Sequence, residues 1–183
     1  MKTALKVGLA YGLVSVLVTL AIWLLNSAWL FSFKLTAVSL IIGTAFIIYF
    51  GRKYFRHPED GSLSYGEALK KTFVALLAGF ALGMIISIVL YGNNASMKEA
   101  YEQFSLETQM QSLALANNIA GGTEADLEML QEELLEDIEN GDVVMSPYPY
   151  SMEALPLTLM SGIFFNLILA LIYAIFIKKT SGI

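Results

Sequence analysis

Few side chains in this chain have the chemistry of a catalytic or metal site, and they are not grouped as such a site requires. His57 is the single histidine and cysteine is absent, so no second imidazole or thiolate can share a metal ion with it. Its basic neighbour Arg56 and the apolar stretch before it favour a contact with lipid headgroups instead. We therefore expect no catalytic residue, no metal ion and no cofactor.

A run of carboxylates late in the chain is the second candidate for chemistry, because such groups can bind divalent cations. The residues are Glu132, Glu133, Glu136, Asp137, Glu139 and Asp142. The run lacks the alternating oxygen ligands and the turn glycine of a calcium loop. We interpret it as the solvated face of a helix.

Four apolar runs determine the architecture in which these residues lie. They cover 7–25, 35–50, 73–91 and 155–177. Hydrophobic residues make up 56% of the 183, more than a soluble domain can bury. A helix needs about 20 apolar residues to cross a bilayer, and the second span is expected to begin before Lys34. The first run could be a secretory signal, but it is longer than the usual signal core and the residues after it lack two small residues at the cleavage spacing, which indicates a span.

The eleven basic residues predict how these spans are oriented. Lysine and arginine are retained on the cytoplasmic side of a membrane, and only Lys34 and Lys98 lie on the face opposite to the others. The other nine are Lys2, Lys6, Arg52, Lys53, Arg56, Lys70, Lys71, Lys178 and Lys179. We expect both termini to be cytoplasmic. The last seven of these residues, from Arg52 to Lys179, could also bind anionic lipid or a partner. We favour the interpretation that they only determine the orientation of the spans.

The segment 92–153 is predicted to fold as a helical hairpin outside the membrane. It holds thirteen of the sixteen acidic residues and one lysine. Ser96 and Glu99 have the spacing of a capping box that begins one helix. Two glycines at 121 and 122 separate it from a second helix, which Thr123 and Asp126 cap and which stops at 140–141. Both helices need packing against each other, the spans or a partner.

These features predict an all-α fold, a four-helix transmembrane bundle with an acidic extracytoplasmic helical hairpin between spans three and four. Spans one to three with short loops occupy 1–91, the hairpin 92–153, and span four with a cytoplasmic tail 154–183. In the inner loop, Pro58 indicates a turn, and Ser64 with Glu67 is spaced as a capping box for the third helix.

Every span carries small residues at helical spacing, which allow backbones to approach closely in lipid. Packing within one chain is the expected use, and homo-oligomerisation through one such face is the alternative. The amide of Asn166, in the middle of the fourth span, is expected to bond a neighbouring helix. The helix-packing candidates are Gly8, Gly12, Gly79, Gly83, Gly162 and Asn166.

The four apolar runs contain no Asp, Glu, Lys, Arg or His. Proton relays, ion-coupled carriers and membrane-embedded hydrolases need such groups. The sequence also lacks a phosphate-binding glycine loop, an HExxH motif and a basic aromatic surface for nucleic acid. We expect neither an enzyme nor a nucleic-acid partner.

The inner loop resembles a stretch of the family called domain of unknown function 4199, in which a basic-aromatic segment precedes an acidic-Gly pair and Ser-Phe-Gly-x-Ala. The matching residues are 52–56, Asp60, Gly61 and 63–68, with Tyr11 and Gly12 near the start of the chain and Thr123 and Glu124 in the outer loop. Tyr65 stands where Phe is usual. The resemblance covers nearly the whole chain and implies a four-span inner-membrane protein of Bacteroidetes-type bacteria, with no activity attached.

Two classes of function remain for a protein whose surroundings are a lipid bilayer. The preferred one is a non-enzymatic accessory or scaffold subunit, acting through contacts with another membrane protein or further copies of itself. The alternative is a small oligomeric channel or carrier. A lumen lined by Ser87, Thr158, Ser161 and Asn166 would favour the alternative, and close helix packing there would favour the first.

Overall fold

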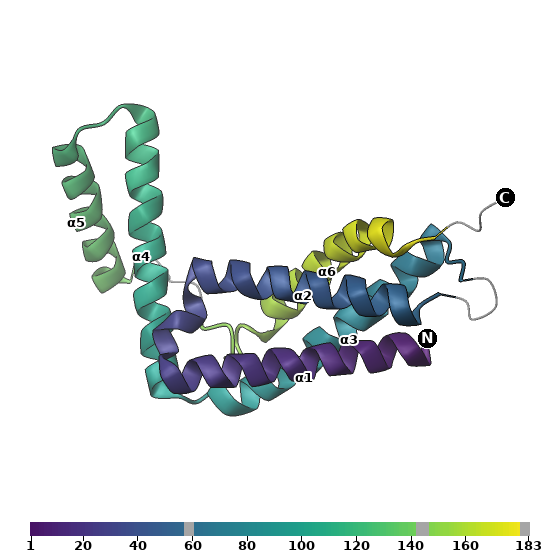
Figure 1. The fold of residues 1–183 in the computed structure, drawn as a ribbon. Helices are drawn as coiled ribbons and strands as arrows, with labels where there is room; N and C mark the ends of the chain where they lie inside the picture. Colours follow the sequence, from purple (N-terminus) through teal and green to yellow (C-terminus); the bar gives the residue numbers. More distant parts are fainter. Residues whose placement is uncertain (57–60, 142–146, 180–183) are drawn as a thin grey trace. The chain divides into compact units, whose positions relative to one another are not determined.

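The described part of the chain is almost entirely helical. The computed structural model describes residues 1–56, 61–141 and 147–179. These residues contain no strand, which confirms the all-α class. The elements in chain order are α1 (Lys2–Leu25), the 3₁₀ helix η1 (Ser27–Phe31), α2 (Phe33–Tyr54), α3 (Tyr65–Tyr91), α4 (Ala95–Ala120), α5 (Glu124–Asn140) and α6 (Leu155–Ile177) (Figure 1). The predictions for His57, Pro58, Asp60 and Asp142 fall outside the described residues.

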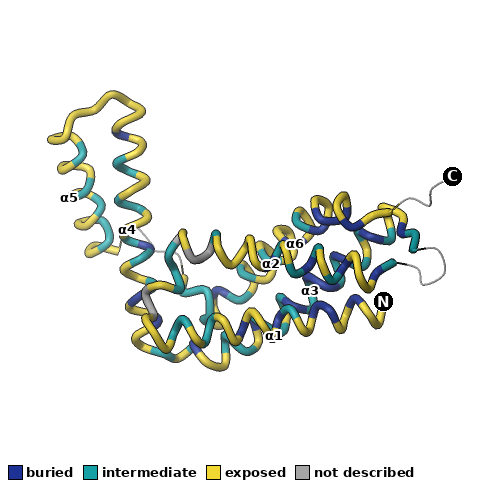
Figure 2. Tube along the Cα trace, viewed as in Figure 1, coloured by how far each residue is buried: buried dark blue, intermediate teal, exposed yellow. Residues whose placement is uncertain are grey.

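Four of these helices are long and apolar enough to cross a membrane, as predicted: α1, the 37–54 part of α2, α3 and α6. Helix α2 begins at Phe33, before Lys34. Large apolar side chains such as Val89, Ile85 and Phe164 are mostly exposed along these helices (Figure 2). Exposure on this scale would be unfavourable in water and is expected of side chains that face hydrocarbon. The chain is therefore a membrane protein.

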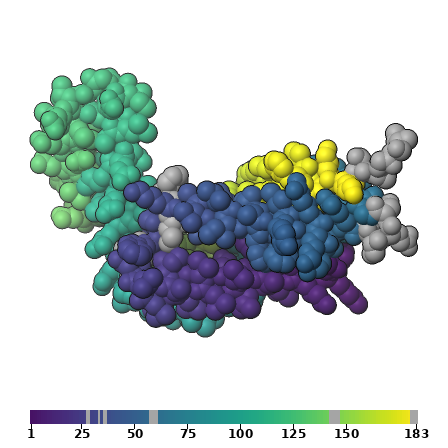
Figure 3. All heavy atoms as spheres, viewed as in Figure 1, coloured from purple at the N-terminus to yellow at the C-terminus, as the bar shows by residue number. Residues whose placement is uncertain are grey.

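The chain divides into two compact units, Met1–Asn93 with Pro149–Ile183, and Asn94–Tyr148. The first unit is the helix bundle. In it α3 packs against α1 and α6, and α2 packs against α1 and α6. The space-filling view shows α1 and α2 side by side over one face of this unit (Figure 3).

The close-packed core of the bundle lies in one half of its length, where α2 and α6 end and α3 begins. Ile47, Leu63, Ala75 and Ala174 are fully buried there. Leu63 also forms an antiparallel bridge with Lys179, with N–H···O distances of 2.8 and 3.0 Å. This bridge joins the residues before α3 to those after α6. Ser64 then caps α3 by accepting a bond from the Glu67 amide, which confirms the predicted cap.

The opposite end of the bundle carries a cluster of aromatic rings. The Tyr91 ring, at the end of α3, lies 5.6 Å from the Trp23 ring and 5.7 Å from the Tyr150 ring. Burial, with the nearby Tyr91, raises the pKa of the Tyr150 hydroxyl. Aromatic residues of this kind are enriched where a span meets the membrane interface.

The second unit consists of α4 and α5, which pack against each other (Figure 1). The prediction that Ser96 caps the first helix is wrong, because the carboxamide oxygen of Asn94 accepts the bond from the Met97 amide and α4 begins at Ala95. Helix α4 ends at Ala120 and is capped by Gly121, whose positive φ of 75° suits a residue without a Cβ. We call this unit the α4–α5 hairpin.

Candidate functional site

The backbones of α1 and α3 approach each other at a patch of small residues. A Cβ on Gly8 would overlap the carbonyl of Ala75, and one on Gly12 would lie 2.7 Å from the carbonyl oxygen of Gly79. A Cβ on Gly79 would lie 2.7 Å from the ring of Tyr11. Small residues thus bring these two helices into backbone contact within a single chain.

The remaining small residues of the predicted packing set lie elsewhere in the bundle. Gly162, on α6, is covered by the ring of Phe80 on α3, which occupies the space where a Cβ would be. A Cβ on Gly83 would meet no atom within 4 Å, because this glycine borders an open space. Gly79 and Gly83 therefore lie one helical turn apart in different surroundings.

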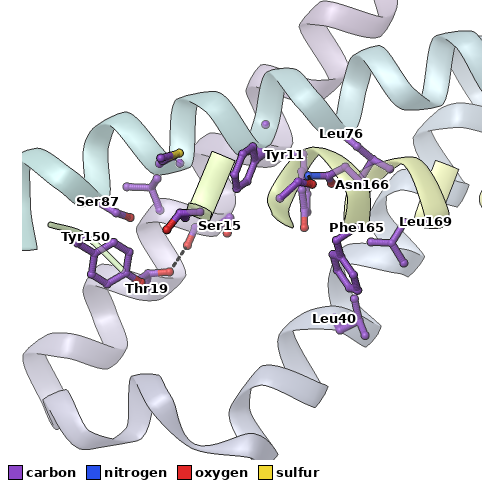
Figure 4. A pocket seen from close by; sticks show the side chains of 17 residues that line it. Tyr11, Ser15, Thr19, Leu40, Leu76, Ser87, Tyr150, Phe165, Asn166 and Leu169 are labelled. Atoms are coloured by element: carbon purple, nitrogen blue, oxygen red, sulfur yellow. Dashed lines mark hydrogen bonds between the residues drawn. The ribbon is translucent and has the colours of Figure 1, made fainter. Parts of the chain in front are cut away.

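That open space is a cavity of about 340 Å³ between α1, α3 and α6 (Figure 4). Leu76, Phe80, Phe165 and Leu169 form part of its apolar wall. The side chains with hydrogen-bonding groups in the lining are Tyr11, Ser15, Thr19, Ser87, Tyr150, Thr158 and Asn166. The cavity is thus an uncharged, hydroxyl-rich space within the bundle.

Asn166 is the most enclosed polar side chain of this lining, with 8% of its surface exposed. The predicted bond to a neighbouring helix is replaced by one within α6, in which its Nδ2 donates to the Gly162 carbonyl at 2.8 Å. An Asn side chain can reach the backbone carbonyl four residues earlier in its own helix, so the bond needs no partner helix. The carboxamide oxygen is not used in this bond and remains an acceptor.

A second cavity of about 310 Å³ adjoins the first between α1 and α2. The two cavities share five lining residues, Tyr11, Ser15, Thr19, Leu40 and Phe165. Val14, Val18, Ile42 and Phe46 line the second cavity only, which makes it the more apolar of the two.

Sequence reasoning placed Ser87, Thr158, Ser161 and Asn166 around the lumen of a channel, and the first cavity is lined by all of these except Ser161. The hydroxyl of Ser161 bonds carbonyls of its own helix. The hydrogen-bonding side chains that α1 contributes to this cavity were not predicted. The spacing of Tyr11, Ser15 and Thr19 could have indicated them, because residues that recur every four positions share one helix face.

Two basic residues hold helix ends together at the end of the bundle where α2 and α6 finish. Nε of Arg52 donates to the Phe176 carbonyl at 2.8 Å, and Nζ of Lys71 donates to the Phe55 carbonyl at 2.7 Å. Cationic side chains satisfy the last carbonyls of a helix in this way.

The other predicted basic candidates have more exposed or local positions. Lys70 is exposed, and Nζ of Lys53 lies 5.3 Å from the centre of the adjacent Tyr54 ring. Lys178 is the C-cap of α6 and Lys179 bonds Leu63 through its backbone. Arg56 is half-buried.

Within the α4–α5 hairpin, helix α5 carries eight carboxylates and no cation. Thr123 and Asp126 form the predicted capping box at its start. Bonds from the Thr123 amide and hydroxyl, both 2.7 Å long, lower the pKa of the Asp126 carboxyl. Among the residues that the structure describes, no three His, Cys, Asp or Glu side chains are close enough to hold a metal ion.

A family model described as Protein of unknown function (DUF4199) matches residues 6–179. The match includes the α4–α5 hairpin and all four helices that are long and apolar enough to cross a membrane, apart from the first four residues of α1. No curated protein and no solved structure matches the chain.

Proposed function

Since the chain belongs to the DUF4199 family, whose description names no activity, we propose that it is a non-enzymatic accessory or scaffold protein of the bacterial inner membrane. It acts through contacts with another membrane protein. The proposal places both termini in the cytoplasm and the α4–α5 hairpin in the periplasm, because the bundle end where α2 and α6 finish is rich in lysine and arginine.

The observation that carries this proposal is a set of exposed apolar side chains on the α4–α5 hairpin. Leu115 and Ile119, one turn apart on α4, are 61% and 80% exposed, and Met129 on α5 is 66% exposed. All three lie within about two helical turns of the 121–122 glycines. Exposed apolar groups in a polar surrounding are typical of protein contact sites. Leu115 and Ile119 share one exposed face of α4, and Met129 belongs to an exposed face of α5.

The charge around these side chains indicates the chemistry of the partner. Helix α5 carries carboxylates along its length and no basic residue. A partner with an apolar pocket and a basic rim would match both features. The same carboxylates are repelled by anionic headgroups, which favours a protein as the partner.

The experiment is affinity purification of the full chain from native membranes in mild detergent, followed by mass spectrometry. We expect one foreign membrane protein in fixed stoichiometry, lost when Ile119→Asp and Met129→Asp are combined. Asn118→Asp combined with Ala116→Asp introduces the same two charges at exposed positions of α4 and is expected to retain the partner. Recovery of the chain alone, or equal recovery of the partner with both variants, would contradict the proposal.

A second candidate function, a small oligomeric channel or carrier, is favoured by the cavity that Ser87, Thr158 and Asn166 line. Uncharged hydroxyl and amide groups can line a path for a neutral solute. The test is solute flux in liposomes that contain the purified protein. Flux that changes with Asn166→Leu while the oligomeric state does not would replace the accessory role with this one.

A further inference from the structure

The two adjoining cavities differ in polarity, as the two parts of an amphiphile do. Only the first has Ser87, Thr158 and Asn166 in its lining, whereas Ser15 lines both (Figure 4). The second is lined mainly by apolar side chains such as Val18 and Ile42. A polar head in the first cavity and a hydrocarbon chain in the second would each meet matching groups.

Access to the second cavity is from the hydrocarbon side of the bundle. Val14, Val18, Leu40 and Ile42 line it and are themselves 41 to 57% exposed. Since exposed side chains of these spans face lipid, an occupant can enter sideways between α1 and α2 without passing through water.

The charge of the lining restricts what the head can be. No residue that lines either cavity is Asp, Glu, Lys, Arg or His, all of the lining belonging to the described residues. An ionised head, such as a phosphate, would lose its hydration and gain no counter-ion there. The head must therefore be uncharged.

The hydrogen-bonding groups restrict the head further. The carboxamide oxygen of Asn166 is an acceptor left over from the bond to Gly162, on a side chain that is only 8% exposed. In hydrocarbon an unsatisfied polar group costs several kcal/mol, so a head that donates a hydrogen bond is favoured. A hydroxyl group beside Asn166 can donate to this oxygen, whereas a head that has only acceptor oxygens, such as an ester, cannot.

From this combination we infer that the cavities bind an uncharged lipid whose head is a hydroxyl group. Acylglycerols and long-chain prenols both have this chemistry. The head lies beside Asn166 and the chain leaves between α1 and α2. The site is independent of the proposed protein contact, which uses the α4–α5 hairpin.

The test uses the purified full chain in liposomes of neutral phospholipid with three photoactivatable probes. These are a diacylglycerol, a prenol, and phosphatidic acid with the same acyl chains as the diacylglycerol. We expect the diacylglycerol or the prenol to label α1 and α2 residues around the second cavity, and phosphatidic acid to label them about tenfold less at equal concentration. The probe that labels better identifies the source of the hydroxyl.

Two glycines of α3 provide a matched pair of variants. A Cβ on Gly83 or on Gly66 would meet no atom within 4 Å, but only Gly83 lines the cavity. Gly83→Leu is expected to reduce labelling about tenfold, and Gly66→Leu to leave it unchanged. If Gly83→Leu does not purify as a uniform species, Ser15→Leu is used instead, because Ser15 lines both cavities. Three results would overturn the inference. The first is equal labelling of the filled-cavity variant and Gly66→Leu, and the second is labelling by phosphatidic acid equal to that by the hydroxyl lipids. The third is no labelling by either hydroxyl lipid.

Discussion

The hydroxyl oxygens of Thr44 on α2 and Tyr173 on α6 lie 2.5 Å apart. Tyr173 is buried, and Thr44 also bonds the Leu40 carbonyl of its own helix. This is a polar contact between two of the apolar helices. It fixes α2 against α6 at one level of the bundle.

A double-mutant cycle with Thr44→Val and Tyr173→Phe is expected to give a coupling energy on the order of 1 kcal/mol, typical of hydrogen bonds between membrane helices. The measurement is the free energy of unfolding in mixed micelles. As a control, Tyr49→Phe changes an exposed tyrosine of the same helix and should show no coupling to Tyr173→Phe. If the changes in free energy of unfolding of the two single variants simply add up to that of the double variant, the contact contributes nothing to stability.

Gly8→Val is expected to lower the free energy of unfolding by about 1–3 kcal/mol. The added side chain would overlap the Ala75 carbonyl and separate α1 from α3. Gly83→Ala, in open space, is the matched control and should leave stability unchanged or raise it. The comparison is made by denaturant titration of both variants, and equal loss of stability in the two would refute the contact between the two backbones.

Protonation of Asp126 is expected to loosen the start of α5. Because bonds from Thr123 lower the pKa of this carboxyl in the folded chain, its stabilising effect is complete above the ordinary carboxyl value of about 3.9. The effect is lost as the pH falls through the lowered value. Hydrogen exchange of the α5 amides, corrected for intrinsic rates, should show protection that falls with acid in the parent chain. That acid dependence should be weaker in Asp126→Asn, and identical profiles would contradict the prediction.

The chain contains no cysteine, so single introduced cysteines can report its orientation. Lys53→Cys at the basic end of the bundle and Ala116→Cys on α4 both replace exposed residues. In intact spheroplasts, an impermeant maleimide is expected to label Ala116→Cys only, and to label both after the membrane is disrupted. Labelling of Lys53→Cys alone in intact cells would reverse the proposed orientation.

The four spans and most helix caps could be predicted because each depends on local sequence. Apolar length decides a span, and Thr123 with Asp126 has the spacing of a cap wherever the helix lies. The first cap of the hairpin was misplaced because Asn94 and Ser96 are both good capping residues two positions apart. Sequence spacing alone does not decide between them.

The cavity could not be predicted, because it depends on how far helices separate along their length. Gly79 and Gly83 belong to the same small-residue stripe, yet only Gly79 contacts α1. The partner of Asn166 was predicted wrongly for a similar reason. A polar residue in a span needs a hydrogen bond, but the sequence does not show whether its own helix or a neighbour provides it.

The contact of Gly8 with Ala75 and the bridge between Leu63 and Lys179 close the bundle at one end, while the cavity lies toward the other. At that other end the rings of Trp23 and Tyr91 hold α1 against α3 again, at the level where aromatic residues meet the membrane interface. The cavity therefore lies between two places where α1 and α3 are in contact, so a substitution that breaks either contact is expected to alter the cavity as well as the stability of the bundle.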